Sequence, residues 1–162
     1  MHAPVATAYA DRRPVHGRIR PVARKQLHRD MDAESSKATR TPFEWIGGEP
    51  VVRRIAGRFY ERMETDTSLA GLRAVHAADL GPMRERLGDF LVGWLGGPPL
   101  YFRRADARCM GQAHAPVPID AALRDQWLAC MGGALADCDV DAALQAQAIA
   151  VLGRMAEGLR NR

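Results

Sequence analysis

The sequence predicts an all-α fold, and three observations lead to that prediction. Apolar residues recur at three- and four-residue spacing over four long stretches. No stretch alternates between apolar and polar residues for long enough to form a strand. Two runs of glycine and proline, Gly47-Gly48 and Gly96-Gly97-Pro98-Pro99, each end a predicted helix. At 162 residues, the chain is long enough for one domain with a core of its own.

Helical spacing begins after Thr41. Pro42 stands at the first position of a short helix with Glu44 in its first turn, and Gly47 and Gly48 end it. A long helix follows directly, with one apolar face made of Val51, Val52, Ile55, Phe59, Tyr60 and Met63.

A second long helix is predicted up to the run Gly96-Gly97-Pro98-Pro99, which stops it. Its apolar face consists of Leu80, Met83, Leu87, Phe90, Leu91 and Trp94. Residues 100–113 are polar and poorly periodic, so we expect at best one or two short turns there. The gap that they leave in a helical core is of the kind that a ligand or cofactor often fills.

Two further helices complete the prediction. Asp120 helps to start the third, whose pattern is Ile119, Ala122, Leu123, Gln126, Trp127, Cys130, Met131 and Ala134. The pattern of the fourth is Val140, Leu144, Ala148, Val151, Leu152, Met155 and Leu159. There is no internal repeat, and the four helices form one bundle.

Charge is distributed unevenly along the chain. Residues 1–40 carry nine Lys and Arg against four Asp and Glu, a net charge of +5, which leaves −1 for residues 41–162. We therefore expect a basic, disordered extension over residues 1–40 and one domain over residues 41–162. Both lysines, Lys25 and Lys37, lie in the extension. Because the domain has no broad basic face, no nucleic-acid partner is expected.

The three cysteines, Cys109, Cys130 and Cys138, show no metal-ligand spacing, and we interpret them as thiols in a reducing compartment. No apolar run reaches the roughly 20 residues of a membrane helix, and the apolar stretch of a signal peptide is missing. We expect a cytoplasmic protein with no membrane partner.

His114 lies at the end of the polar gap and is followed by two prolines. Pro116 and Pro118 lack a backbone donor and hold the residues before them extended, which predicts a stiff loop. A stiff loop suits a metal ligand, although a single histidine beside a turn is more often structural. No second His, Cys or carboxylate stands three or four residues further on. A zinc or di-iron site is thus disfavoured, and a cofactor that brings most of its own ligands, such as haem, is favoured.

Five motifs stand in order between residue 41 and about residue 160. They are Ile46-Gly47-Gly48, Arg58-Phe59-Tyr60, Asp89-Phe90-Leu91-x-x-Trp94-x-Gly96-Gly97-Pro98, His114-Ala115-Pro116-x-Pro118-Ile119 and Arg124-Asp125-x-Trp127-Leu128-x-Cys130-Met131. In this order the motifs resemble those of the group II truncated haemoglobins. The resemblance implies a truncated globin fold, which is a two-over-two helical sandwich around haem b.

The resemblance also implies roles for single residues. His114 matches the proximal histidine that binds the haem iron. Tyr60 and Trp127 match the donors that contact a diatomic ligand on the distal side, although each would otherwise be interpreted as a core residue. His76 falls near the distal pocket, where it would contact the ligand or Tyr60, or face water. Three apolar residues are expected beside the haem together with Trp127: Met83, Leu87 and Phe90.

The chain departs from the family pattern just before His114. Gly111 and Ala113 stand where the family has basic side chains that pair with haem propionates, and we expect Arg108 or Arg104 to replace them. The loss of one or two exposed ion pairs costs about 0–1 kcal/mol each. The departure therefore predicts looser retention of haem, with the fold kept.

The implied function is reversible binding of O₂, NO and CO at a pentacoordinate haem iron, by a monomer or a homodimer. NO dioxygenase or peroxidase-type activity is a secondary expectation that needs an external reductase, because the chain contains no flavin or nicotinamide motif. The alternative is a globin-fold sensor or protein-interaction domain in which haem binding is weakened or lost. The changed segment 106–113 and the basic extension favour that alternative.

Overall fold

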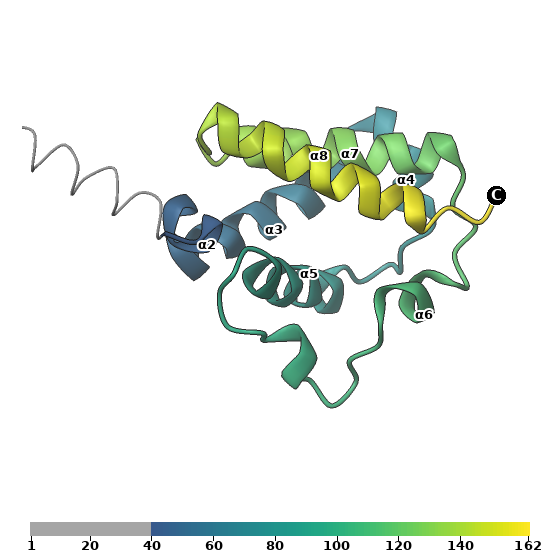
Figure 1. Ribbon diagram of the computed structural model, residues 1–162. Coiled ribbons are helices and arrows are strands. Elements are labelled where there is room, and N and C mark those ends of the chain that lie inside the picture. Colours follow the sequence, from purple (N-terminus) through teal and green to yellow (C-terminus); the bar gives the residue numbers. More distant parts are fainter. Residues whose placement is uncertain (1–39) are drawn as a thin grey trace, which may run out of the picture. The chain divides into compact units, whose positions relative to one another are not determined.

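The computed structural model describes residues 40–162, and every element in that range is helical. The α-helices are α2 (Pro42–Ile46), α3 (Gly48–Thr65), α4 (Ala70–Ala74), α5 (Gly81–Trp94), α6 (Met110–His114), α7 (Ala121–Ala136) and α8 (Ala142–Gly158) (Figure 1). Two 3₁₀ turns, η1 (Thr67–Leu69) and η2 (Tyr101–Arg103), lie between them. The all-α prediction is confirmed. Apart from Arg40, the predicted basic extension lies outside the described residues.

The long helices form two pairs. α3 packs against α5, α7 packs against α8, and α3 also contacts α7, so that one pair lies on the other (Figure 1). The buried face of α3 holds Val52, Ile55, Ala56, Phe59, Tyr60 and Met63. Burial of each large side chain in this face contributes about 1.5–3 kcal/mol to folding. The result is the two-over-two arrangement that the sequence predicts.

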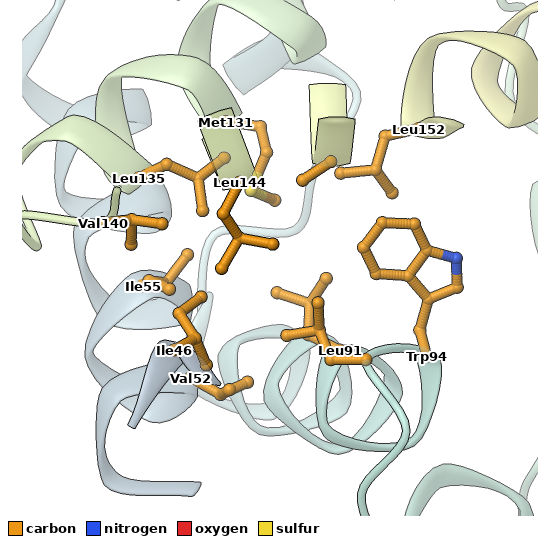
Figure 2. Close-up of a pocket in the computed structure, with 12 residues that line it drawn as sticks. Ile46, Val52, Ile55, Leu91, Trp94, Met131, Leu135, Val140, Leu144 and Leu152 are labelled. Atoms are coloured by element: carbon orange, nitrogen blue, oxygen red, sulfur yellow. The ribbon is translucent and has the colours of Figure 1, made fainter. Parts of the chain in front are cut away.

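The core is filled where the four long helices meet. Figure 2 shows Ile55 from α3, Leu91 from α5 and Leu144 from α8 pointing toward one another. They line a cavity of about 20 Å³ whose other lining side chains are also apolar, with Trp94 on one side. A cavity that is small and apolar stays dry. This one is a packing gap in the core.

α2 is attached to the end of α5. Thr41 and Glu44 form a capping box: the Thr41 hydroxyl accepts from the Glu44 N–H at 3.2 Å, and the Glu44 carboxylate accepts from the Thr41 N–H at 2.9 Å. Gly96 has a φ of +97°, and a Cβ at this position would lie 3.1 Å from the Cβ of Thr41. The backbone there therefore requires glycine. The predicted helix start at Thr41 and the stop at Gly96 are both confirmed.

The structure adds one short helical segment that the sequence pattern did not predict. η1 and α4 lie between α3 and α5, and they bury Leu69 and Leu72 in the core. Two apolar residues three apart are too few to show a helical period. His76 lies just after this segment, in the connection between α4 and α5. Within residues 40–162, none of the helices has the length and apolar character needed to cross a bilayer.

Candidate functional site

A second cavity, of about 740 Å³, lies beside α5, α6, α7 and α8, and its volume is typical of a site for a small molecule or cofactor. All eight site residues predicted from the sequence line it: Tyr60, His76, Met83, Leu87, Phe90, Arg108, His114 and Trp127. They come from α3, α5, α6, α7 and two connecting segments. Residues that are far apart in the chain thus share one cavity.

His114 is the last residue of α6, and its imidazole is half-buried. Its Nδ1 lies 2.8 Å from the backbone carbonyl oxygen of Met110. Because a carbonyl oxygen can only accept, Nδ1 donates its proton in this hydrogen bond. The lone pair of His114 is therefore on Nε2, which is the tautomer that a metal-binding histidine adopts.

His76 repeats this geometry in another segment. Its Nδ1 lies 2.8 Å from the carbonyl oxygen of Leu72, and its ring centroid lies 6.0 Å from that of Tyr60 with the rings edge to face. Burial lowers the pKa of His76 below its usual value and outweighs the hydrogen bond to Leu72, which raises it; the positive charge of Arg73 lowers the pKa further. At pH 7 His76 is therefore a neutral imidazole with its lone pair on Nε2.

Tyr60 and Trp127 place two donor groups at the cavity. Tyr60 is only 3% exposed, and within residues 40–162 its hydroxyl makes no hydrogen bond. Burial raises the pKa of Tyr60, so the phenol stays protonated at neutral pH. The indole of Trp127 packs on Phe59, with ring centroids 5.6 Å apart. An indole N–H can only donate.

Three arginines line the cavity. Arg86 pairs with Asp106, and Arg124 pairs with Glu157. Arg108 is exposed and has no ion pair within the described part of the chain. Of these three guanidinium groups, only that of Arg108 has no carboxylate partner of its own.

Arg104, the other arginine that we expected to replace the missing basic residues, does not line the cavity. Its Nη1 donates to Asp89 at 2.8 Å and its Nε donates to Asp106 at 3.1 Å. Arg104 is thus part of an ion-pair network, and the expectation that it substitutes at the cavity is not supported.

Asp89 is the centre of that network. It is 8% exposed and also accepts from Arg53 of α3, whose Nη2 lies 2.7 Å away. Burial by itself raises the pKa of Asp89, but the hydrogen bonds and charges of Arg104 and Arg53 outweigh it and hold the pKa below its usual value. The ionised carboxylate therefore fastens the segment after η2 to α5 and α3.

A second contact holds the same segment. The Tyr101 hydroxyl donates to the carbonyl oxygen of Arg108 at 2.9 Å. Tyr101 is buried, and its ring meets that of Phe90 edge to face with centroids 6.1 Å apart. The chain that enters α6 is thus attached to the cavity wall just before the segment that carries His114.

The cysteines take no part in this site. Cys130 is buried, donates to the carbonyl oxygen of Phe59 at 3.1 Å, and has a pKa that burial raises to about 12. Cys109 is exposed and Cys138 is half-buried, and both are free thiols. This agrees with the interpretation of all three as plain thiols.

Arg86 and Tyr101 also line the cavity, although neither was predicted from the sequence as a site residue. Arg86 lies three residues after Met83 and four before Phe90, so helical spacing already placed it on the same face as two predicted cavity residues. For Tyr101 no such signal existed, because the turn that carries it has no period.

Comparisons with known proteins agree with this geometry. The family model described as "Bacterial-like globin" matches residues 41–161. A curated relative, "Group 2 truncated hemoglobin YjbI" of Bacillus subtilis (strain 168), is 33% identical over 88 residues, which are 54% of this chain. The matched region spans 64% of the length of that relative, which is less than two thirds.

Solved structures are similar over most of their own length. The cold-adapted truncated haemoglobin from the Antarctic marine bacterium Pseudoalteromonas haloplanktis TAC125 is 35% identical with a TM-score of 0.72, over 76% of this chain and 99% of that one. The group II 2-on-2 haemoglobin from the plant pathogen Agrobacterium tumefaciens is 37% identical with a TM-score of 0.72, over 76% of this chain and 95% of that one. The chain therefore belongs to the bacterial-like globin family and, within it, to the group II truncated haemoglobins.

Proposed function

We propose that this chain binds haem b through His114 and takes O₂, NO or CO at the haem iron. The observation that carries the proposal is the arrangement of side chains around one cavity. His114 presents an unprotonated Nε2, and Tyr60, from a different helix, presents a hydroxyl that makes no hydrogen bond within residues 40–162. A side chain that can bind a metal, His114, and a side chain that can donate to a molecule bound on that metal, Tyr60, thus line the same cavity.

The residues of the cavity fit haem on four counts. The hydroxyl of Tyr60 makes no hydrogen bond within residues 40–162 and is accessible from the cavity, so a ligand there can accept its proton. The walls offer an apolar lining, including Met83, Leu87 and Phe90. Arg108 offers an unpaired guanidinium to a carboxylate. Among the described residues, no group of three or more His, Cys, Asp or Glu side chains could hold a metal ion, and this suits a macrocycle that brings four ligands of its own.

When bound, haem would supply an iron that takes a small diatomic molecule. His114 would hold that iron through Nε2, and its hydrogen bond to Met110 keeps the imidazole in the required tautomer. Tyr60 and Trp127 would donate to the diatomic molecule. A hydrogen bond to a partly charged acceptor contributes about 1–3 kcal/mol, or roughly 5- to 150-fold in dissociation rate.

His76 adds a neutral imidazole beside Tyr60. Since its Nδ1 proton is donated to Leu72, only Nε2 remains, and Nε2 can accept from a donor in the cavity but cannot donate. We therefore assign His76 to orienting Tyr60, or a water beside it, rather than to donating to the diatomic ligand.

The alternative function, a globin fold that no longer holds haem, is decided by titration of the protein with haem. Wild-type protein is expected to show a Soret band that saturates at one haem per chain. His114→Ala should shift or weaken the band, whereas Gln112→Ala, on the exposed side of the same short helix, should leave it unchanged. A missing band, or a His114→Ala spectrum identical to wild type, would count against haem ligation by His114.

NO dioxygenase and peroxidase-type activities are further proposals that rest on the family alone. Stopped-flow mixing of O₂-loaded protein with NO tests the first of them. Rapid oxidation to the ferric protein, renewed by a reductase and its electron donor, would support it, and slow or absent oxidation would count against it.

A further inference from the structure

The loop between α6 and α7 is held by a residue that follows α8. Two prolines, Pro116 and Pro118, make this loop stiff along its own backbone, but they also remove two N–H donors. The loop consequently makes few hydrogen bonds within itself. Its remaining polar groups need partners elsewhere in the fold.

Asn161 supplies those partners. Its Oδ1 accepts from the N–H of Ile119 at 2.9 Å, and its Nδ2 donates to the carbonyl oxygen of Val117 at 2.9 Å. The backbone N–H groups of Asn161 and Arg162 both donate to the carbonyl oxygen of Ile119, at 3.0 and 3.1 Å. Figure 1 shows the chain after α8 passing beside the segment that leads into α7. One side-chain amide thus binds the backbone on both sides of Pro118.

This contact leads directly to His114. The N–H of Val117 donates to the carbonyl oxygen of His114 at 2.9 Å, which closes the end of α6. Asn161 therefore holds a residue that itself holds the last turn of α6. Ile119 is buried, and both residues that Asn161 binds, Val117 and Ile119, line the same cavity as His114.

α6 has little else to fix it. The helix has five residues, none of them buried, and its N-cap residue, Cys109, makes no side-chain capping bond. Before α6 the chain is attached through Arg108 to Tyr101, and after α6 it is attached through Val117 and Ile119 to Asn161. A helix this short is unstable by itself, so its orientation depends on these two attachments.

We propose that Asn161 is a positioning residue for His114: it fixes the orientation of the imidazole toward the haem iron by holding the backbone at Val117 and Ile119. The proposal rests on the proposed function, in which His114 is the axial ligand. Asparagine fits because its amide has one acceptor and one donor group at the spacing of the two backbone groups. Aspartate would keep the acceptor for Ile119 but would lose the donor to Val117.

The first test needs no haem. Amide hydrogen exchange of the full apo-chain should show a protected Ile119 N–H in wild type. Asn161→Ala should speed exchange of that amide roughly 5- to 10-fold, the loss expected for one hydrogen bond. Arg162→Ala keeps its backbone N–H and should behave as wild type. Equal exchange in wild type and Asn161→Ala would overturn the proposal.

The second test reads the position of the imidazole. Resonance Raman spectra of the ferrous haem-loaded protein should show an iron–histidine stretching band that shifts or broadens in Asn161→Ala, less so in Asn161→Asp, and not in Arg162→Ala. Transfer of haem to an acceptor protein should be roughly tenfold faster for Asn161→Ala. If Asn161 served stability alone, Asn161→Ala would lower the melting temperature and leave the band unchanged.

The outcomes separate this proposal from the proposed function. A wild-type protein with the band, together with an Asn161→Ala band of the same frequency and width, would overturn the positioning role and leave haem ligation intact. A wild-type protein without the band would overturn both.

Discussion

The Nδ1 atom of His114 lies 2.8 Å from the carbonyl oxygen of Met110, four residues earlier in the chain. His76 stands in the same relationship, at the same distance, to the carbonyl oxygen of Leu72. In both cases the backbone fixes the tautomer and leaves Nε2 unprotonated. The two histidines differ in their surroundings. His114 lies on a helix held from both sides, whereas His76 lies beside Tyr60 with its pKa lowered by burial.

Removal of the hydroxyl of Tyr60 should speed release of O₂. We expect Tyr60→Phe to raise the O₂ dissociation rate roughly tenfold, because one hydrogen bond to a partly charged ligand is lost. Stopped-flow replacement of O₂ by CO measures this rate. Since burial raises the pKa of Tyr60, the wild-type rate should not change between pH 7 and about pH 9, above which an unperturbed phenol begins to ionise. A Tyr60→Phe rate equal to wild type would contradict the distal role.

Trp127 and Trp94 allow the same substitution to be compared at two different cavities. Trp127 lines the large cavity and Trp94 lines the small core cavity (Figure 2). Trp127→Phe should therefore speed O₂ release about 5-fold or more, through loss of the indole donor. Trp94→Phe should lower stability and leave the dissociation rate near wild type. If both variants changed the rate equally, Trp127 would have no specific role as a donor.

The ion pairs of Asp89 should make stability depend on acid pH. The pKa of Asp89 is held below that of an unfolded aspartate, about 3.9, so its contribution is fully present above roughly pH 4 to 5. The contribution is lost as pH falls through the folded-state pKa. Asp89→Asn should lower the free energy of unfolding by about 1–3 kcal/mol at pH 7, and the difference from wild type should shrink below pH 4.

Glu85→Gln is the control for Asp89. Glu85 lies on the same helix and reaches Arg53 only at 3.6 Å, with its side chain 68% exposed. Urea unfolding across pH 3 to 8 should show little difference between Glu85→Gln and wild type. A constant gap between Asp89→Asn and wild type over the whole range would mean that ionisation of Asp89 contributes nothing.

Arg108 should retain haem through its charge. Arg108→Ala is expected to speed haem loss about 2- to 5-fold, which corresponds to an exposed ion pair of up to about 1 kcal/mol. The effect should weaken at high salt. Arg103→Ala is the control, because Arg103 is exposed and does not line the cavity. Equal haem loss from both variants would show that the position of Arg108 is of no consequence.

We propose that residues 41–162 form the haem-binding unit. Deletion of residues 1–40 should then leave the Soret spectrum and the haem stoichiometry unchanged. The comparison is a haem titration of the full chain and the shortened chain side by side. A shifted Soret band in the shortened chain would mean that the extension reaches the haem.

The periodic helices were predictable because burial of one face leaves a pattern in the sequence. Val52, Ile55 and Phe59 show that pattern in α3, and Leu144, Ala148 and Leu152 show it in α8. Asp120 was likewise predictable as a helix start, and its carboxylate accepts from the N–H of Leu123 at 2.8 Å. Local rules of this kind need only neighbouring residues.

The attachments of α6 were not predictable, because they join distant parts of the chain. Asn161 binds Ile119 and Val117, which precede it in the chain by 42 and 44 positions. Asp89 accepts from Arg53, which precedes it by 36 positions. No period or motif marks such pairs. The prolines after His114 predict a stiff loop, but the sequence could not show that Asn161 donates to Val117 and accepts from Ile119 in this loop.

Haem ligation by His114 is tested most directly by resonance Raman spectroscopy of the ferrous, ligand-free protein. We expect an iron–histidine stretching band in wild type, its loss in His114→Ala, and its return when free imidazole is added to that variant. A wild-type spectrum without the band, or the same band in His114→Ala without imidazole, would contradict ligation of the haem iron by His114.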